Sequence, residues 1–168
     1  MAKAKPVPDG FHTATPYLIQ DDCAKAIDFY ARAFGAEEVV RHTMGGRIGH
    51  AEVQVGDSRI MMSDEMPPMG NQPVVHKSPK TGGFTTAGLF LYVRDCDAAF
   101  DRAVKAGCTV RQPPADMFWG DRFSQVTDPF GQSWSLATHI EDVPPAEMKK
   151  RAEAFAAQMQ GMGKKKQG

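Results

Sequence analysis

His50 and Glu52 are the residues of this sequence best placed for acid–base or metal chemistry, because they lie two positions apart in the β-like run Arg47 to Val55. Side chains two apart share one face of a strand. The apolar residues that alternate with them must pack in the core, so His50, Glu52 and Gln54 are expected to face a cleft. An imidazole beside a carboxylate suits general-base catalysis, which makes His50 and Glu52 candidate catalytic residues. The alternative is a purely structural polar pair that hydrogen-bonds to neighbouring strands.

A second segment rich in chemistry is the run Phe118 to Phe123, which combines three aromatic side chains with an acid and a base. Burying the guanidinium of Arg122 would be costly without an anionic partner, either a carboxylate of the chain or one of a ligand. Core packing is the alternative for the aromatic side chains. Phe90 and Tyr92 share a strand face with Gly88 and would add apolar walls to a cleft. The candidate ligand-binding residues are therefore Gln54, Phe90, Tyr92, Trp119, Asp121 and Arg122.

A repeat indicates which elements position these residues. The run Asp22 to Asp28 recurs as Asp95 to Asp101, and in both copies apolar residues follow helical spacing. The leading aspartate can cap each helix, and Gly35 or Gly107 can end it. One β-like run precedes each helix and three follow it. The sequence therefore predicts two βαβββ units.

The boundaries of these elements follow from the same patterns. The expected strands are 13–20, 37–43, 47–55 and 59–63 in the first copy and 89–94, 109–112, 121–127 and 133–138 in the second. Pro113-Pro114 is expected to form a loop. The predicted organisation is a flexible N-terminus 1–10, a first unit 11–65, a linker loop 66–83, a second unit 84–141, a C-terminal helix 144–160 and a basic flexible tail 161–168.

The C-terminal helix is predicted from an apolar stripe at helical spacing, formed by Met148, Ala152, Phe155 and Met159. Such a stripe needs a surface to cover it. The chain's own sheet and a second subunit are both possible surfaces, and the second would make the protein a homodimer.

Three features resemble the vicinal oxygen chelate superfamily of glyoxalases, bleomycin-resistance proteins and extradiol dioxygenases. They are the paired βαβββ units, the helix end from Asp28 to Ala36, and the turn Asp128-Pro129-Phe130-Gly131 ahead of Trp134. The runs Ile48–Val53, Ile60–Pro67 and Met117–Phe123 resemble its PhnB-like branch more narrowly. The resemblance implies an α+β fold in which two tandem βαβββ units form a curved eight-stranded mixed sheet with a cleft, plus the C-terminal helix.

The resemblance also implies positions for the ligands of a divalent metal ion, on the first and last strand of each unit. In this sequence these positions fall on Ala14, Gly88, Ser135 and either Met62 or Ser63. None of these side chains offers the imidazole or carboxylate that such an ion needs. We therefore expect no cofactor and no metal ligands, with a divalent metal as the alternative.

Composition excludes several classes of partner. Twenty Lys and Arg against twenty Asp and Glu leave a net charge of +0, which gives no electrostatic reason to bind nucleic acid or an anionic membrane. Apolar runs long enough for a membrane span or a secretory signal are missing, so a cytoplasmic protein is expected. Its three cysteines lack zinc or disulfide spacing.

The favoured function is therefore binding of a small molecule in the sheet cleft without the usual metal. One alternative is a metal-dependent glyoxalase-like lyase, isomerase or dioxygenase. The other is a structural or interaction protein without catalysis.

Overall fold

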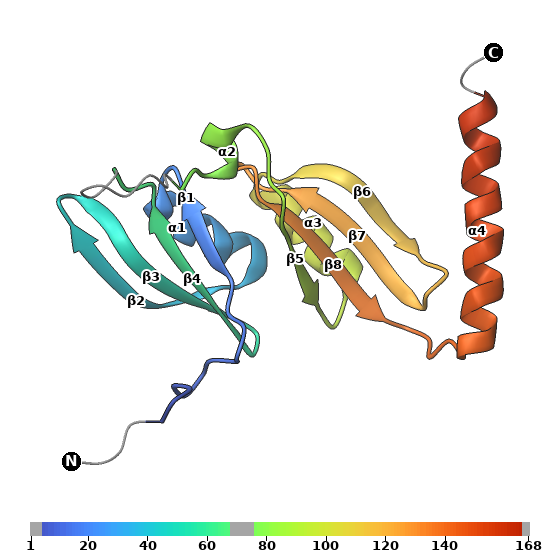
Figure 1. Ribbon diagram of the computed structural model, residues 1–168, viewed down its shortest axis with the longest axis horizontal. Coiled ribbons are helices and arrows are strands. Elements are labelled where there is room, and N and C mark those ends of the chain that lie inside the picture. The colour runs from blue at the N-terminus through green and yellow to red at the C-terminus, as the bar shows by residue number, and fades with distance from the viewer. Residues whose placement is uncertain (1–4, 68–75, 166–168) are drawn as a thin grey trace.

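The computed structural model describes residues 5–67 and 76–165, with side chains as far as residue 158, and shows the two βαβββ units side by side (Figure 1). The first unit comprises β1 (Tyr17–Gln20), α1 (Cys23–Phe34), β2 (Glu37–Met44), β3 (Arg47–Val55) and β4 (Ser58–Asp64). The second comprises β5 (Gly88–Tyr92), α3 (Cys96–Ala106), β6 (Thr109–Asp116), β7 (Asp121–Thr127) and β8 (Ser133–His139). Two further helices are α2 (Pro79–Gly82) and α4 (Pro145–Lys165). The predicted flexible ends and the linker lie partly outside the described residues.

Each unit helix begins and ends where local chemistry dictates. The carboxylate of Asp22 accepts a hydrogen bond from the amide of Lys25 at 3.0 Å, and Asp95 accepts one from Ala98 at 2.9 Å. Helix α1 ends at Gly35, whose φ of 70° is a left-handed conformation that glycine adopts without strain. The predicted caps are confirmed.

The strands form two four-stranded mixed sheets of identical topology, with the orders β1-β4-β3-β2 and β5-β8-β7-β6. In each, the first strand runs parallel to the last, and the other pairs are antiparallel. The predicted α+β fold class is confirmed, with the eight strands divided between two sheets. The short strands β1 and β5 are the inner edges of the two units.

The expected loop at Pro113-Pro114 is wrong, because both prolines lie within β6. Proline cannot donate a backbone hydrogen bond, so it is tolerated only at the edge of a sheet or at a bulge. Strand β6 meets both conditions: it is the outer strand of its sheet, and its register with β7 shifts between Gln112 and Ala115.

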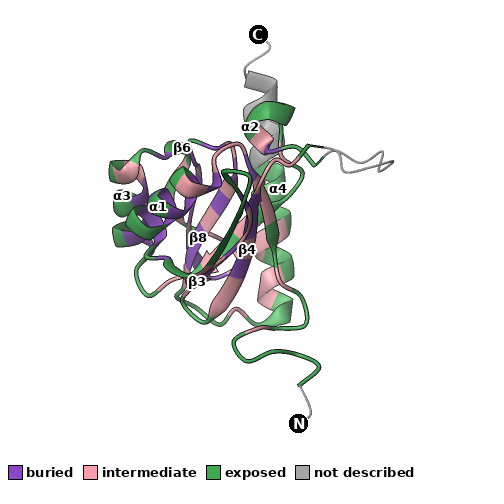
Figure 2. Ribbon diagram, turned by 90° about the vertical axis from the view of Figure 1, so that its left-hand side faces the viewer, coloured by how far each residue is buried: buried purple, intermediate pink, exposed green. Residues whose placement is uncertain are grey.

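The core lies between the helices and one face of each sheet, and α1 and α3 pack side by side (Figure 2). Trp134 of β8 crosses from the second unit and stacks on Phe34 of α1, with ring centroids 4.1 Å apart. Beside it, the buried carboxylate of Asp128 accepts hydrogen bonds from the Tyr30 hydroxyl and from the Trp134 indole, each at 2.9 Å. These contacts join the two units into one core. The opposite face of each sheet, here called its open face, is not covered by any of the helices that the structure describes.

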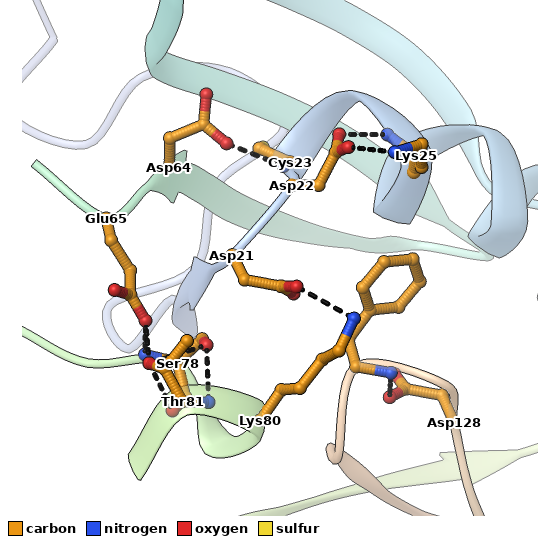
Figure 3. A network of polar contacts seen from close by, with 11 residues as sticks. Asp21, Asp22, Cys23, Lys25, Asp64, Glu65, Ser78, Lys80, Thr81 and Asp128 are labelled. Carbon is orange, nitrogen blue, oxygen red and sulfur yellow. Dashed lines mark hydrogen bonds and ion pairs between the residues drawn. The ribbon is translucent and has the colours of Figure 1, made fainter.

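Helix α2 lies within the predicted linker and is tied to the first unit by Glu65 (Figure 3). The Glu65 carboxylate accepts hydrogen bonds from the Ser78 amide at 2.7 Å and from the Thr81 hydroxyl. Desolvation alone would raise the pKa of Glu65, but hydrogen bonds from Thr81 and Ser78 outweigh it and lower this pKa to about 2. These hydrogen bonds of Glu65, here called the clamp, fix the segment that leads into β5.

Helix α4 stands beside the β6–β7 hairpin at one end of the molecule (Figure 1). Its Phe155 ring lies 5.2 Å from Phe118, and its Arg151 pairs with Glu141 at 2.8 Å. Phe155 nevertheless remains 38% exposed. The predicted helix is therefore present, and it packs only lightly on its own chain; the side chain of Met159 lies outside the described residues. Among the helices that the structure describes, none is long and apolar enough to span a membrane.

Candidate functional site

The open face of the first sheet carries a chain of polar contacts, here called the polar row, formed by Tyr17, His50, Glu52 and Arg59. The Tyr17 hydroxyl lies 3.4 Å from Nδ1 of His50, and Nε2 of His50 lies 3.2 Å from Glu52. The other oxygen of Glu52 accepts a hydrogen bond from Nη1 of Arg59 at 3.1 Å. Alternation along β3 places His50 and Glu52 together as the sequence predicts, and Tyr17 and Arg59 join them from β1 and β4.

The polar row gives each ring nitrogen of His50 a polar partner. Glu52 also forms an ion pair with Arg59, and both side chains are largely buried. In the tautomer with its proton on Nε2, His50 donates a hydrogen bond to Glu52, and Nδ1 can accept a hydrogen bond from the Tyr17 hydroxyl or from a ligand. Gln54 lies on the same face but donates to the carbonyl of Gly56 at 3.0 Å, so it takes no part in the row.

The open face of the second sheet holds a cavity of about 660 Å³, here called the open-face cavity. Its floor is formed by alternate residues of β5, β7 and β8, because Phe90 lies opposite Ser135, and Ser135 lies opposite Gln125. Its rim is the segment after α2. The lining residues are Pro79, Gly83, Phe84, Thr85, Thr86, Ala87, Gly88, Phe90, Arg111, Gln125, Thr127, Gly131, Ser133 and Ser135.

A smaller cavity of about 140 Å³ lies between the two units and touches both candidate surfaces. Ala14 and Arg59 line it from the first unit, and Phe90 lines it from the second. Phe90 also lines the open-face cavity. The polar row and the open-face cavity therefore approach each other at Arg59 and Phe90.

Three of the predicted ligand-binding residues form a separate cluster around the buried carboxylate of Asp121. This carboxylate accepts hydrogen bonds from the Tyr92 hydroxyl at 3.2 Å and from the Trp119 indole at 3.0 Å. His139 lies 2.8 Å from the same carboxylate and 2.9 Å from that of Asp142, and these two contacts raise the pKa of His139 above its usual value of 6.5. Asp121 is thus engaged by groups of the chain.

Arg122 lies on the opposite face of β7, next to the N-terminus of α3. Its guanidinium donates two hydrogen bonds to Asp97, both at 2.7 Å, and one to Asp116 at 3.1 Å. The chain itself therefore supplies the anionic partner that Arg122 requires. Asp121 and Arg122 are neighbours in one strand, so their side chains point to opposite faces, and Arg122 is left out of the ligand site.

The positions at which the resemblance implies metal ligands do not fit a divalent ion. Gly88 and Ser135 lie on the open face, Ala14 precedes β1, and Met62 is buried against the core. These side chains lack an imidazole or a carboxylate. Within residues 5–67 and 76–165, no three His, Cys, Asp or Glu side chains gather closely enough to hold a metal ion.

The cysteines are also unsuited to chemistry. All three are free and buried, and burial raises the pKa of Cys23 and of Cys108 to about 12. A thiol with such a pKa stays protonated near neutral pH, and only the thiolate is a strong nucleophile.

Several lining residues of the open-face cavity were not singled out from the sequence. Simple alternation places Gln125, Thr127 and Ser133 on the same face as Phe90. Alternation by itself does not show which faces of different strands coincide, so these residues can be assigned to the cavity only when the pairing of β7 and β8 with β5 is known. Arg111 lies inside the expected strand 109–112, but the bulge that brings it to the cavity is visible only in the pairing of β6 with β7.

Comparison with known proteins agrees with this fold. A sequence profile of the Glyoxalase/Bleomycin resistance protein/Dioxygenase superfamily matches residues 11–136. An uncharacterized protein of Mycobacterium bovis is 40% identical over 131 residues, which cover 77% of this chain and 84% of that protein.

Among solved structures, TioX from Micromonospora sp. ML1 superposes with a TM-score of 0.61 at 26% identity, covering 76% of this chain and 99% of TioX. The PhnB protein from Bacillus cereus shares the fold with a TM-score of 0.53 at 17% identity, covering 76% of this chain and 99% of that protein. With the profile match spanning both βαβββ units, the chain belongs to the Glyoxalase/Bleomycin resistance protein/Dioxygenase superfamily.

Proposed function

We propose that this protein binds a small organic molecule in the open-face cavity of its second unit. The observation that carries the proposal is the cavity itself. Its volume of about 660 Å³ lies within the range of roughly 300–1,000 Å³ that is usual for small-molecule sites. Polar groups from β6, β7 and β8 converge on it, while Phe84 and Phe90 offer apolar walls. Such a mixture orients a ligand by hydrogen bonds and retains it by burial of apolar surface.

The proposed binding mode does not depend on a metal, because the side chains at the implied ligand positions do not fit one. We also propose that the chain belongs to the PhnB-like branch of the superfamily. The support for this finer placement is the set of three sequence runs around Ile48–Val53, Ile60–Pro67 and Met117–Phe123, together with the shared fold of the PhnB protein from Bacillus cereus.

The cavity can be tested by filling it from Gly88. A Cβ atom built at Gly88 would approach Ser133 no closer than 3.6 Å, an ordinary contact, so a larger side chain can enter the cavity without backbone strain. The matched control is Gly82, where an added Cβ would lie 3.7 Å from Lys77 and which does not line the cavity.

The experiment is a thermal-shift screen of dicarbonyls, catechols, thiol conjugates and antibiotics, because a ligand that binds only the folded state raises the melting temperature. A compound that stabilises the wild type and the Gly82→Leu variant should have no effect on Gly88→Leu. Equal stabilisation of all three proteins would refute the site. Melting of the unliganded Gly88→Leu variant shows separately that it folds.

A second candidate function is acid–base catalysis at the polar row, with His50 accepting a proton at Nδ1 while Glu52 orients the ring. The continuous contacts from Tyr17 to Arg59 favour it. Replacing His50 with Gln keeps the polar character of the position and removes the titrating group. We expect ligand turnover, if the screen yields a substrate, to be lost in this variant while the melting temperature changes little; unchanged turnover would refute the role of His50.

A further inference from the structure

We infer that the ligand of the open-face cavity is a small organic oxyanion, a carboxylate or phosphonate on an apolar body, whose charged group is held by Arg111. The inference rests on the proposed function, since it uses the same cavity. It goes further by naming the chemical class of the ligand and the residue that selects it.

A β-bulge places Arg111 at the cavity. Val110 of β6 pairs with Val126 of β7, but the next pair is Gln112 with Gln125, so Arg111 is the additional residue on its strand. In a bulge two residues of one strand lie opposite a single residue of the other, and the strand bends there, which re-aims a side chain. Gln125 lies on the open face, and Arg111 lines the cavity beside it.

The charge of Arg111 is not neutralised by the chain. Among the lining residues that the structure describes, none is acidic and Arg111 alone is charged. Within the described residues, its guanidinium makes no ion pair or hydrogen bond with another side chain, whereas Arg59, Arg122 and Arg151 are each paired with carboxylates. Arg111 therefore brings to the cavity a positive charge that no described carboxylate neutralises.

The remaining groups complement an oxyanion attached to an apolar body. A guanidinium presents parallel N–H donors that match the two oxygens of a carboxylate or two of a phosphonate. The Gln125 amide and the hydroxyls of Ser133 and Ser135 can donate further hydrogen bonds. Phe90 and Phe84 are 48% and 72% exposed, and an apolar body would cover them.

The test compares matched probes by isothermal titration calorimetry on the full chain. The probes are 3-phenylpropionate, phenylphosphonate and the neutral 3-phenylpropan-1-ol. Arg111→Gln is compared with Arg94→Gln, which removes the same charge. Arg94 lies exposed in the turn between β5 and α3, does not line the cavity, and likewise has no partner among the described residues.

We expect at least one of the anions to bind the wild type and the Arg94→Gln variant with similar affinity, and at least tenfold more tightly than the alcohol. Arg111→Gln should lose at least tenfold in affinity for that anion and little for the alcohol. Arg111→Lys should restore only part of the loss, because lysine keeps the charge without the planar pair of donors.

Three outcomes would overturn the inference. They are failure of both anions to bind the wild type at millimolar concentration, equal affinity for the alcohol, and equal losses in the Arg111 and Arg94 variants. The Gly88→Leu variant distinguishes an error in the ligand class from an error in the binding site. If it retains full affinity for a bound probe, the cavity is not the site and the proposed function falls as well.

Discussion

The buried carboxylate of Asp128 should be the most sensitive polar group of the fold, because it joins the two units. One of its oxygens accepts the backbone amides of Phe130 and Gln132 at 2.8 and 2.9 Å. The other accepts the hydroxyl of Tyr30 and the indole of Trp134. An asparagine has nearly the same shape but only one such oxygen, so Asp128→Asn leaves one of these two pairs of donors without its acceptor.

The magnitude follows from which donors can find another partner. If the amide oxygen stays with the two backbone donors, the new NH₂ group faces Trp134 and Tyr30. The Trp134 indole can only donate and is fully buried, so it loses its hydrogen bond at a cost of about 1–3 kcal/mol. The Tyr30 hydroxyl can turn to Oε1 of Gln20, a buried oxygen that has no other partner among the described residues, but the Gln20 amide must then reorient.

We therefore expect Asp128→Asn to lower the free energy of unfolding by about 2–4 kcal/mol. For a chain of this size, that corresponds to a fall of roughly 4–16 °C in melting temperature. Urea and thermal unfolding, followed by circular dichroism, measure both quantities. The matched control is Asp57→Asn in the exposed β3–β4 turn, which should change stability by no more than about 0.5 kcal/mol. Equal effects of the two substitutions would refute this account of the junction.

Three further perturbations test the clamp, the Asp121 cluster and α4. The pKa of Glu65 is about 2 in the folded chain, against 4.5 ordinarily. The stabilisation that Glu65 contributes is therefore present above pH 4.5 and is lost as the pH falls toward 2. When the urea midpoint is plotted against pH, Glu65→Gln should flatten this part of the curve. The pKa of His139 is raised above 6.5 by Asp142 and Asp121. The stabilisation that His139 contributes is therefore present below pH 6.5 and is lost as the pH rises through the raised pKa. An NMR titration of the ring measures this pKa, and a value at or below 6.5 would contradict the cluster. The homodimer expected from the sequence stays a prediction, and light scattering should give a mass of about twice 18.4 kDa. A chain without residues 144–168 should melt at a lower temperature. If α4 crosses the dimer interface, this shortened chain should also be monomeric. A monomeric full chain would refute the dimer, and an unchanged melting temperature would show that α4 contributes no stability.

Much of the candidate site on the first sheet could be predicted, because it depends on alternation within one strand. His50 and Glu52 lie on the same face of β3 in contact with each other, as their spacing requires. Their partners Tyr17 and Arg59 could not be predicted in the same way, since they come from strands whose register is set only by pairing. On the second sheet, grouping Asp121 with Arg122 ignored the same alternation, and the structure places these two neighbours on opposite faces.

Local chemistry in the sequence was sufficient for the repeated βαβββ order, the aspartate caps and the glycine ends, because each depends on residues only a few positions apart. Tertiary structure alone decided the contacts between distant segments. Tyr30 meets Asp128 only because α1 packs against the second unit. Pro113 and Pro114 are accommodated in a strand only because β6 is an edge, and Arg111 reaches the open-face cavity because that edge carries a bulge. The partners of a strand decide whether it lies at an edge and which of its residues forms a bulge. A single run of sequence does not contain those partners.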